Sequence, residues 1–376
     1  MLIGVPRETA AGETRVAATP ETVKKLKAQG HTLRIEGGAG VAASITDEAF
    51  AAAGAEIVGR AEALGSDLVL KVRSPGADEL TLMKSGSALV GMLNPFDRAG
   101  LDALAGAGLT SFALEAAPRT TRAQSMDVLS RQANIAGYKA VLVAAERYQR
   151  FLPMLMTAAG TVKAARVVVL GVGVAGLQAI ATAKRLGAVI EASDVRPSVK
   201  EQVESLGGKF IDVAYETAEE KEAAEGVGGY ARPMPQGWLD RQKAEVAKRI
   251  AAADIVISTA LIPGRAAPVL ISEEMVRSMK PGSVIVDLAA GRGEGGQGGN
   301  CPLTEADRTV VKHGVTIVGE TNLASRVAAD ASSLYARNVL DFLKLVLTKE
   351  STFQVPMDDD IVAACLMTQG GEVKRT

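Results

Sequence analysis

Residues 166–194 read RVVVLGVGVAGLQAIATAKRLGAVIEASD. An apolar run is followed at once by glycines spaced G-x-G-x-x-G, at Gly171, Gly173 and Gly176, and then by a segment with helical periodicity. In dinucleotide-binding turns the first glycine permits a tight turn, the second lets the backbone approach a pyrophosphate, and the third lets helix and strand pack closely. The stretch therefore predicts a strand, a phosphate-binding turn and a helix whose N-terminus supplies amide donors.

A second apolar strand ends at Asp194, which is 194 − 176 = 18 residues after Gly176. A carboxylate at this position accepts hydrogen bonds from the adenosine ribose hydroxyls and repels a 2′-phosphate. The pattern predicts NAD(H) rather than NADP(H), with Arg196 as the one residue nearby that can meet a phosphate. The alternative is a turn or capping aspartate in a Rossmann-like domain that binds no nucleotide.

Strand and helix signals alternate along the 376 residues, as in LIGVP, DLVLKV, ALVGML, DIVISTA and SVIVDLA. This alternation predicts an α/β fold of two Rossmann-like domains with mostly parallel sheets, the second inserted into the first, and a cofactor in the cleft. We expect residues 1–129 and 320–376 to form the first domain, completed by a helix over 325–347 and a hairpin within 352–371. Residues 130–319 would form the NAD(H)-binding domain.

Charge and cysteine content exclude several classes of protein. The 42 lysines and arginines nearly balance the 43 aspartates and glutamates, so no net field attracts nucleic acid or an acidic membrane. The two cysteines, Cys301 and Cys365, do not suggest a disulfide framework. No signal peptide and no apolar run of membrane-spanning length is evident, and we expect a soluble, cytoplasmic protein without a bound metal.

The only histidines, His31 and His313, each precede a predicted strand, at the sheet edge opposite to the one where ligands gather. We therefore expect both to be surface turn residues rather than acid–base groups. Dehydrogenases that act on alcohols or hydroxy acids need such a group, whereas hydride transfer between two nicotinamides does not.

Two stretches interrupt the alternation. Residues 214–236 are charged and then rich in glycine and proline, and their length predicts a functional mobile loop. Residues 291–299, GRGEGGQGG, are expected to form a tolerant surface insertion.

The segments RTTRAQSMDVLSRQANIAGYKAV, SDVRPSVKEQVESLGGKF, STALIPGRAAPVLI and GNCPLTEAD resemble the NAD(H)-binding component of proton-translocating nicotinamide nucleotide transhydrogenases. The resemblance covers essentially the whole chain and extends to the related alanine dehydrogenases. It implies that Arg119, Gln124, Asp127 and Ser130 surround the nicotinamide. It also implies further cofactor contacts by Gly171, Gly173, Val174, Gly176, Asp194, Val195, Arg196, Leu261, and, in a closing loop, Gly229 and Tyr230.

The chain departs from the alanine dehydrogenase pattern at two places. Met92 and Leu93 lie where that pattern has a histidine, and Ala290 lies where it has an aspartate. These departures argue against a 2-oxo acid substrate, although Lys71 and Arg15 can still bind a carboxylate.

The resemblance implies a homodimer that binds NAD(H) and passes hydride to NADP+ held by an NADP(H)-binding partner subunit. A separate membrane-spanning subunit would couple proton flow and hold the chain at the cytoplasmic face of the inner membrane. Two alternatives stay open, namely an alanine dehydrogenase or similar oxidoreductase, and a non-catalytic NAD(H)-sensing module.

Overall fold

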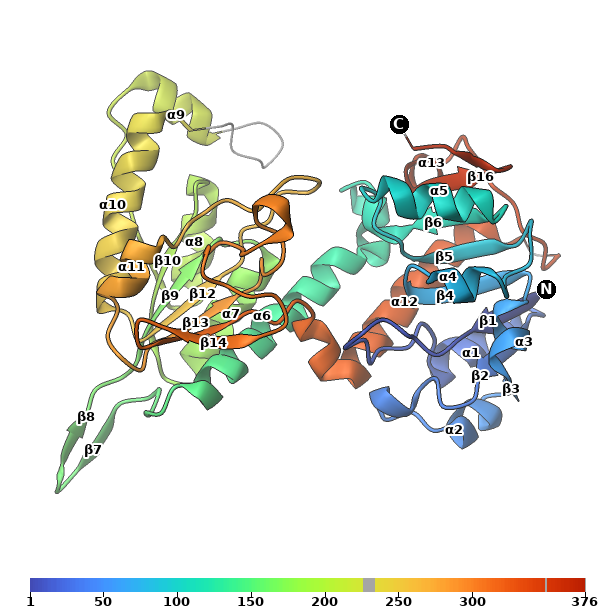
Figure 1. Ribbon diagram of the computed structural model, residues 1–376, viewed down its shortest axis with the longest axis horizontal. Coiled ribbons are helices and arrows are strands. Elements are labelled where there is room, and N and C mark those ends of the chain that lie inside the picture. Colours follow the sequence, from blue (N-terminus) through green and yellow to red (C-terminus); the bar gives the residue numbers. More distant parts are fainter. Residues whose placement is uncertain (226–233, 349, 376) are drawn as a thin grey trace. The chain divides into compact units, whose positions relative to one another are not determined.

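The computed structural model describes residues 1–225, 234–348 and 350–375, and the chain divides into two compact units (Figure 1). Unit 1 comprises Met1–Gln132 and Ala324–Thr376, and unit 2 comprises Ala133–Leu323. Each unit is built on one large, mostly parallel sheet covered by helices, so the predicted α/β fold with two Rossmann-like domains is confirmed.

Unit 1 contains an eight-stranded sheet in the order β17-β16-β6-β5-β4-β1-β2-β3. All neighbours are parallel except at β16, which is antiparallel to β6 and β17. From β3 to β6 the order is that of a doubly wound fold. The strands are β1 (Leu2–Val5), β2 (Thr32–Glu36), β3 (Glu56–Val58), β4 (Leu68–Arg73), β5 (Ala88–Met92), β6 (Thr110–Ala113), β16 (Leu366–Gln369) and β17 (Glu372–Val373).

Two apolar layers cover this sheet. One face packs on α1, α2 and α12, and the other on α3 and α5. Alternating residues of a strand point to opposite faces, so Leu68 and Leu70 belong to the first layer and Val69 to the second. The helices are α1 (Pro20–Ala28), α2 (Asp47–Ala52), α3 (Arg60–Leu64), α4 (Ala77–Leu80), α5 (Arg98–Gly106), α12 (Ala328–Val346) and α13 (Asp360–Cys365).

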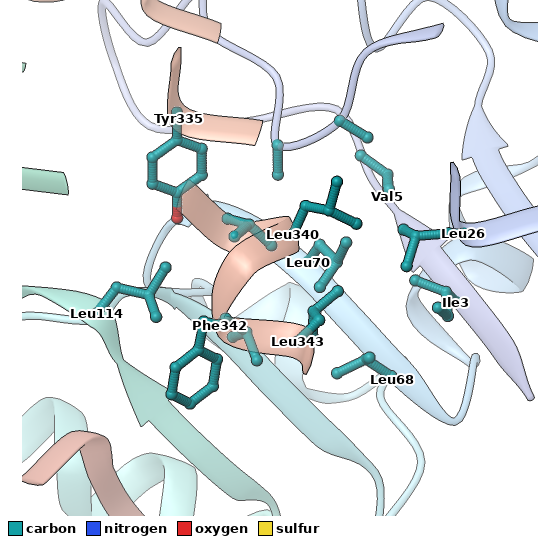
Figure 2. Close-up of a cluster of buried hydrophobic side chains, with 14 of the residues drawn as sticks. Ile3, Val5, Leu26, Leu68, Leu70, Leu114, Tyr335, Leu340, Phe342 and Leu343 are labelled. Atoms are coloured by element: carbon teal, nitrogen blue, oxygen red, sulfur yellow. The ribbon is translucent and has the colours of Figure 1, made fainter. Parts of the chain in front are cut away.

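Helix α12 is the predicted amphipathic helix, and Figure 2 shows its apolar side chains against β1 and β4. Phe342 is fully buried, with its ring centroid 5.3 Å from that of Phe112 on β6. The Tyr335 hydroxyl donates to the carbonyl oxygen of Lys71 over 2.6 Å. Residues far apart in sequence thereby complete one core.

Unit 2 contains a seven-stranded sheet in the order β11-β10-β9-β12-β13-β15-β14, again doubly wound and parallel except at β14. Helices α6 and α7 pack on one face, and α10 and α11 on the other. The strands are β9 (Arg166–Leu170), β10 (Val189–Ser193), β11 (Lys209–Phe210), β12 (Ile255–Ser258), β13 (Val284–Asp287), β14 (Thr309–Lys312) and β15 (Val315–Val318). The helices are α6 (Val128–Arg147), which starts in unit 1, α7 (Val174–Arg185), α8 (Lys200–Ser205), α9 (Ala218–Glu225), α10 (Gln236–Ala252) and α11 (Glu273–Ser278).

The structure corrects the placement of both histidines. His31 is buried rather than exposed, beside the chain's N-terminus, since the Thr32 amide donates to the carbonyl of Met1. Burial and the nearby terminal amino group lower the pKa of His31. His313 is exposed as expected, but it follows strand β14 rather than a helix. With positive φ at His313 and Gly314, these two residues form the tight turn of the β14–β15 hairpin.

Several segments expected to be loops or turns have regular structure. Within 214–236, residues 218–225 form α9, because their alanines, glutamates and lysine favour helix. Asp359 starts α13 as its N-cap, so the C-terminal hairpin is only β16–β17 and turns at Gly370 and Gly371. A third, unpredicted hairpin, β7 (Leu155–Thr157) with β8 (Gly160–Val162), extends away from the sheet of unit 2 (Figure 1).

In the described part of the chain, no helix is both long and apolar enough to cross a membrane.

Replacing Phe342 with alanine should destabilise the protein by about 3–5 kcal/mol, because a buried aromatic ring is lost and leaves a cavity. Lys344→Ala, on the exposed side of α12, should cost less than about 0.5 kcal/mol. Urea unfolding of both variants measures the difference. Equal stability of the two variants would contradict the core assigned to α12.

Candidate nucleotide-binding site

The strand order of unit 2 reverses at β9, which pairs with β10 on one side and β12 on the other. Ligands of doubly wound sheets bind at such a point, beyond the carboxyl ends of the strands. Gly171 follows β9 and Thr259 follows β12, and the Thr259 hydroxyl donates to the Gly171 carbonyl over 2.8 Å. The predicted glycine turn therefore lies at the switch point of the sheet.

Two of the three glycines are required by the chain's own packing. Gly171 has a φ of +88°, and a Cβ there would lie 2.8 Å from the Thr259 hydroxyl. A Cβ on Gly176 would lie 2.0 Å from the carbonyl oxygen of Gly171. Gly173 has a negative φ, and a Cβ on it would meet no atom within 4 Å. The fold leaves the surface at Gly173 open, which suits close approach of a ligand to the backbone.

Helix α7 starts at Val174, directly after this open surface. Gly173 is its N-cap and provides no side-chain acceptor. The first amides of a helix have no intrahelical partner, and together with the helix dipole they attract an anion. The half-exposed Val174 side chain leaves these amides at the protein surface. The turn is thus suited to a pyrophosphate.

Asp194 closes the site at the end of β10. Its Oδ2 accepts from the Val172 amide over 2.7 Å, and its Oδ1 accepts from the Arg196 amide over 2.9 Å. The Arg196 guanidinium adds two bonds, from Nε to Oδ1 at 2.9 Å and from Nη2 to Oδ2 at 3.0 Å. All four lone-pair positions of the carboxylate therefore have donors. Arg196 is paired with Asp194, and Val195 between them is partly exposed.

Leu261 lies in the loop after β12, where residues 261–266 are all exposed. Leu261 is 54% exposed, and Ile262 beside it is also exposed. The loop is held through Asn300, which the sequence reasoning did not identify and which the GNCPLTEAD segment gave no means of finding. Gly229 and Tyr230 lie outside the described residues.

The RTTRAQSMDVLS residues lie in unit 1. Arg119 and Gln124 are exposed, and Gln124 lies on a short 3-10 helix, η3 (Thr121–Met126). Asp127 and Ser130 lie at the start of α6, where the Ser130 amide donates to Asp127 Oδ1 over 2.9 Å. Asp127 therefore caps α6. The structure brings Asp127 and Ser130 together and leaves Gln124 directed to solvent.

Two residues missed by the sequence reasoning hold η3 in place. Arg122 donates to both carboxylate oxygens of Asp359 over 2.7 Å and also binds Asp360. The hydrogen bonds from Arg122 lower the pKa of Asp359 to about 2. From α12, the buried Asn338 donates to the Ser125 carbonyl over 2.6 Å. Both partners come from the C-terminal segment, about 200 residues away in sequence, so no local pattern indicates them.

The cations proposed for carboxylate binding are bound to glutamates of the chain. Arg15 donates to Glu13 over 2.6 and 2.7 Å, and Lys71 lies 2.9 Å from Glu79 and 3.3 Å from Glu8. Burial alone would raise the pKa of Glu13, but hydrogen bonds and charge from Arg15 lower it to about 2. Burial raises the pKa of Glu8 despite Lys71. Both cations thus have internal counter-ions.

The residues that replace acid–base groups of the alanine dehydrogenase pattern, Met92, Leu93 and Ala290, are buried and apolar. Among the described residues, no three His, Cys, Asp or Glu side chains are grouped so as to hold a metal ion. Both cysteines are buried and free.

Known proteins match the chain along its full length. Family models described as alanine dehydrogenase/PNT, N-terminal domain and C-terminal domain, match residues 4–136 and 140–376. An NAD(P) transhydrogenase subunit alpha of Rhodospirillum rubrum is 52% identical over 382 residues, which cover 99% of this chain and 97% of that one. Alanine dehydrogenase of Mycobacterium tuberculosis is 34% identical over 87% of this chain and 82% of its own length.

A solved structure gives the same assignment. The crystal structure of transhydrogenase from Sinorhizobium meliloti superposes with a TM-score of 0.88 at 48% identity, covering 99% of this chain and all of that one. Identity is higher to the transhydrogenase subunit than to alanine dehydrogenase. The chain therefore belongs to the alanine dehydrogenase/PNT family, among the alpha subunits of NAD(P) transhydrogenase.

Proposed function

We propose that this chain is the NAD(H)-binding catalytic component of a proton-translocating transhydrogenase. It binds NADH and transfers hydride to NADP+ held on a partner subunit, while a membrane-spanning subunit couples the transfer to proton movement. The observation that carries the proposal is the glycine turn of unit 2, open at Gly173 and bordered by Asp194, in a chain so similar to transhydrogenase alpha subunits.

The nucleotide lies along the carboxyl edge of the sheet in unit 2. The amides at Gly173 and Val174 bind the pyrophosphate, and Leu261 contacts the adenosine. Asp194 accepts from the ribose, for which Arg196 must give up part of its bond to the carboxylate. In this proposal Val195 contributes its exposed surface, and Gly229 and Tyr230 close over the bound nucleotide.

Arg119, Gln124, Asp127 and Ser130 orient the nicotinamide. Hydride transfer between two nicotinamides moves no proton, so these residues need only align one ring for transfer. The bond between Asp127 and the Ser130 amide fixes the first turn of α6, and the anchors on η3 fix the segment that carries Gln124. A static first turn is what a positioning role requires.

Alanine dehydrogenase is the second candidate, because a relative of that name shares the fold and 34% of residues. Arg15 and Lys71 would have to bind a substrate carboxylate while each already contacts a buried glutamate. The positions of its histidine and aspartate are apolar here. These contacts favour the transhydrogenase proposal.

The β7–β8 hairpin supports the homodimer of this proposal. Its residues are all exposed, among them Met156 at 71%, and Met154 and Phe151 beside it are also exposed. An extended apolar hairpin of this kind is typical of a surface that a second protein covers. In the assembly, partner subunits hold the dimer at the cytoplasmic face of the inner membrane.

NADH should bind well and NADPH much more weakly, because Asp194 repels a 2′-phosphate. Asp194→Asn keeps an acceptor for the Val172 amide but removes the charge, and should weaken NADH by about 1.5–3 kcal/mol. Equilibrium titration of NADH fluorescence measures both. Equal affinity of the unaltered protein for NADH and NADPH would show that the assignment is wrong.

Gln124→Asn and Asp127→Asn should slow hydride transfer to a family NADP(H)-binding domain, about tenfold or more, with NADH affinity nearly unchanged. Asparagine at 127 can still cap α6, so the loss reports the charge and not the helix. Arg98→Gln, at an exposed pair on α5, is the control. Transfer at the normal rate in both variants, or pyruvate reduction with ammonium by the chain alone, would contradict the proposed roles.

Met156→Asp should shift the chain from dimer to monomer in sedimentation velocity, since a charge replaces an exposed apolar side chain at the proposed interface. Val41→Asp, at a similarly exposed residue of unit 1, should leave the dimer intact. A monomeric unaltered chain, or a Met156→Asp variant that stays dimeric, would rule out the hairpin interface.

A further inference from the structure

The loop between β12 and α11 has no packing that would fix its outer part. Residues 261–266 are exposed without exception, including the apolar Leu261 and Ile262. The shape of this segment is therefore set where it starts, at Ala260, and where it ends, at residues 267–271.

Asn300 binds both ends of this loop. Its Oδ1 accepts from the Ala260 amide over 3.0 Å, and its Nδ2 donates to the carbonyls of Ala260 and Pro268, each over 2.9 Å. Its own carbonyl accepts from the amides of Leu270 and Ile271. One fully buried residue thus makes five hydrogen bonds to the two ends.

The start of the loop adjoins the glycine turn. Thr259 donates through its amide to Leu170 and through its hydroxyl to Gly171. A Cβ on Gly171 would lie 3.1 Å from the Ala260 amide nitrogen. A movement of Ala260 would therefore displace both the loop and the wall of the turn.

Asn300 is itself fixed by the carboxylate of Asp287, at the end of β13. Asp287 is completely buried and accepts from the amides of Ala289, Asn300 and Cys301 and from the hydroxyls of Ser258 and Thr304. A buried carboxylate with so many donors is a rigid support, because losing any donor would cost free energy.

The glycine-rich insertion, residues 291–299, belongs to this support and is more than the tolerant surface insertion expected from its composition. Its ends meet, since the Gly291 amide donates to the Gly298 carbonyl over 2.7 Å. A Cβ on Gly299 would lie 2.5 Å from Asp287 Oδ2. The Ala267 amide donates to the carbonyl of Arg292 over 2.7 Å, which adds a bond at the far end of the loop.

We propose that Asn300, supported by Asp287 and the base of the glycine-rich insertion, is a positioning residue for nucleotide binding. It touches no ligand, but it holds the loop that presents Leu261 and Ile262 to the adenosine half of NAD(H). The proposal rests on the proposed NAD(H) site in unit 2. It assigns a role to a buried amide and to the insertion that the glycine turn does not require.

Asn300→Asp tests the proposal most sharply, because it keeps the shape but turns two donors toward carbonyls into acceptors. The dissociation constants of NADH and of AMP should both rise about tenfold or more, and that of nicotinamide mononucleotide should stay unchanged. Calorimetric titration measures all three. A general structural loss would weaken the three ligands alike.

Ser283→Ala is the matched control, since it removes a buried hydrogen bond to Ala253 at the other end of β13. It should lower Tm without altering any of the three affinities. Unchanged NADH and AMP binding by Asn300→Asp would overturn the positioning role. Failure of the unaltered chain to bind NADH would instead overturn the proposed function.

The unaltered chain supplies a measurement that needs no variant. The amides of Ala260 and Ala267 should exchange slowly with deuterated water even without nucleotide, because both are hydrogen-bonded. The milder Asn300→Ser should speed exchange at Ala260 and replaces Asn300→Asp in the titrations if that variant does not fold. Fast exchange at Ala260 in the unaltered chain would contradict the proposal.

Discussion

The close approach of α7 to the end of β9 is the constraint on which unit 2 depends. A Cβ on Gly176 would lie 2.0 Å from the carbonyl oxygen of Gly171, so the helix can start here only without a side chain at that position. This contact directs the N-terminus of α7 at the switch point of the sheet, where the order reverses between β10 and β12. The open surface at Gly173, the bonds of Asp194 and the loop after β12 are all arranged around that turn.

Both units share the doubly wound strand order, yet they use the switch point differently. In unit 1 the corresponding position lies between β1 and β4, and the chain fills it with its own carboxylate, since Glu8 accepts from the amides of Val72 and Arg73. Lys71 and Arg15 lie in the same unit with their charges already paired. One topology thus yields an open nucleotide turn in unit 2 and a closed polar core in unit 1, and only side chains at the strand ends make the difference.

Local patterns were sufficient to predict the strands of both sheets and the glycine turn, because period-two apolar runs and glycine spacing reflect local geometry. They failed where distant segments decide. His31 is buried because the N-terminus lies beside it, and the role of Asp359 as a helix cap bound to Arg122 depends on η3, far away in sequence. Asn300 could not be identified for the same reason, since the five groups that it binds lie 29–40 residues earlier. The composition of 291–299 indicated flexibility, but the contacts of Gly299 give it a fixed base.

Direct hydride transfer from one nicotinamide held by this chain, with no proton relayed, is the central claim. The most direct measurement follows the transferred atom. NADH deuterated at the transferring C4 position is mixed in ordinary water with this chain and a family NADP(H)-binding domain carrying an NADP+ analogue, and the product is analysed by mass spectrometry. Full retention of deuterium in the reduced analogue is the predicted result, because no acid–base group intervenes. Hydrogen from solvent at that carbon would contradict direct transfer.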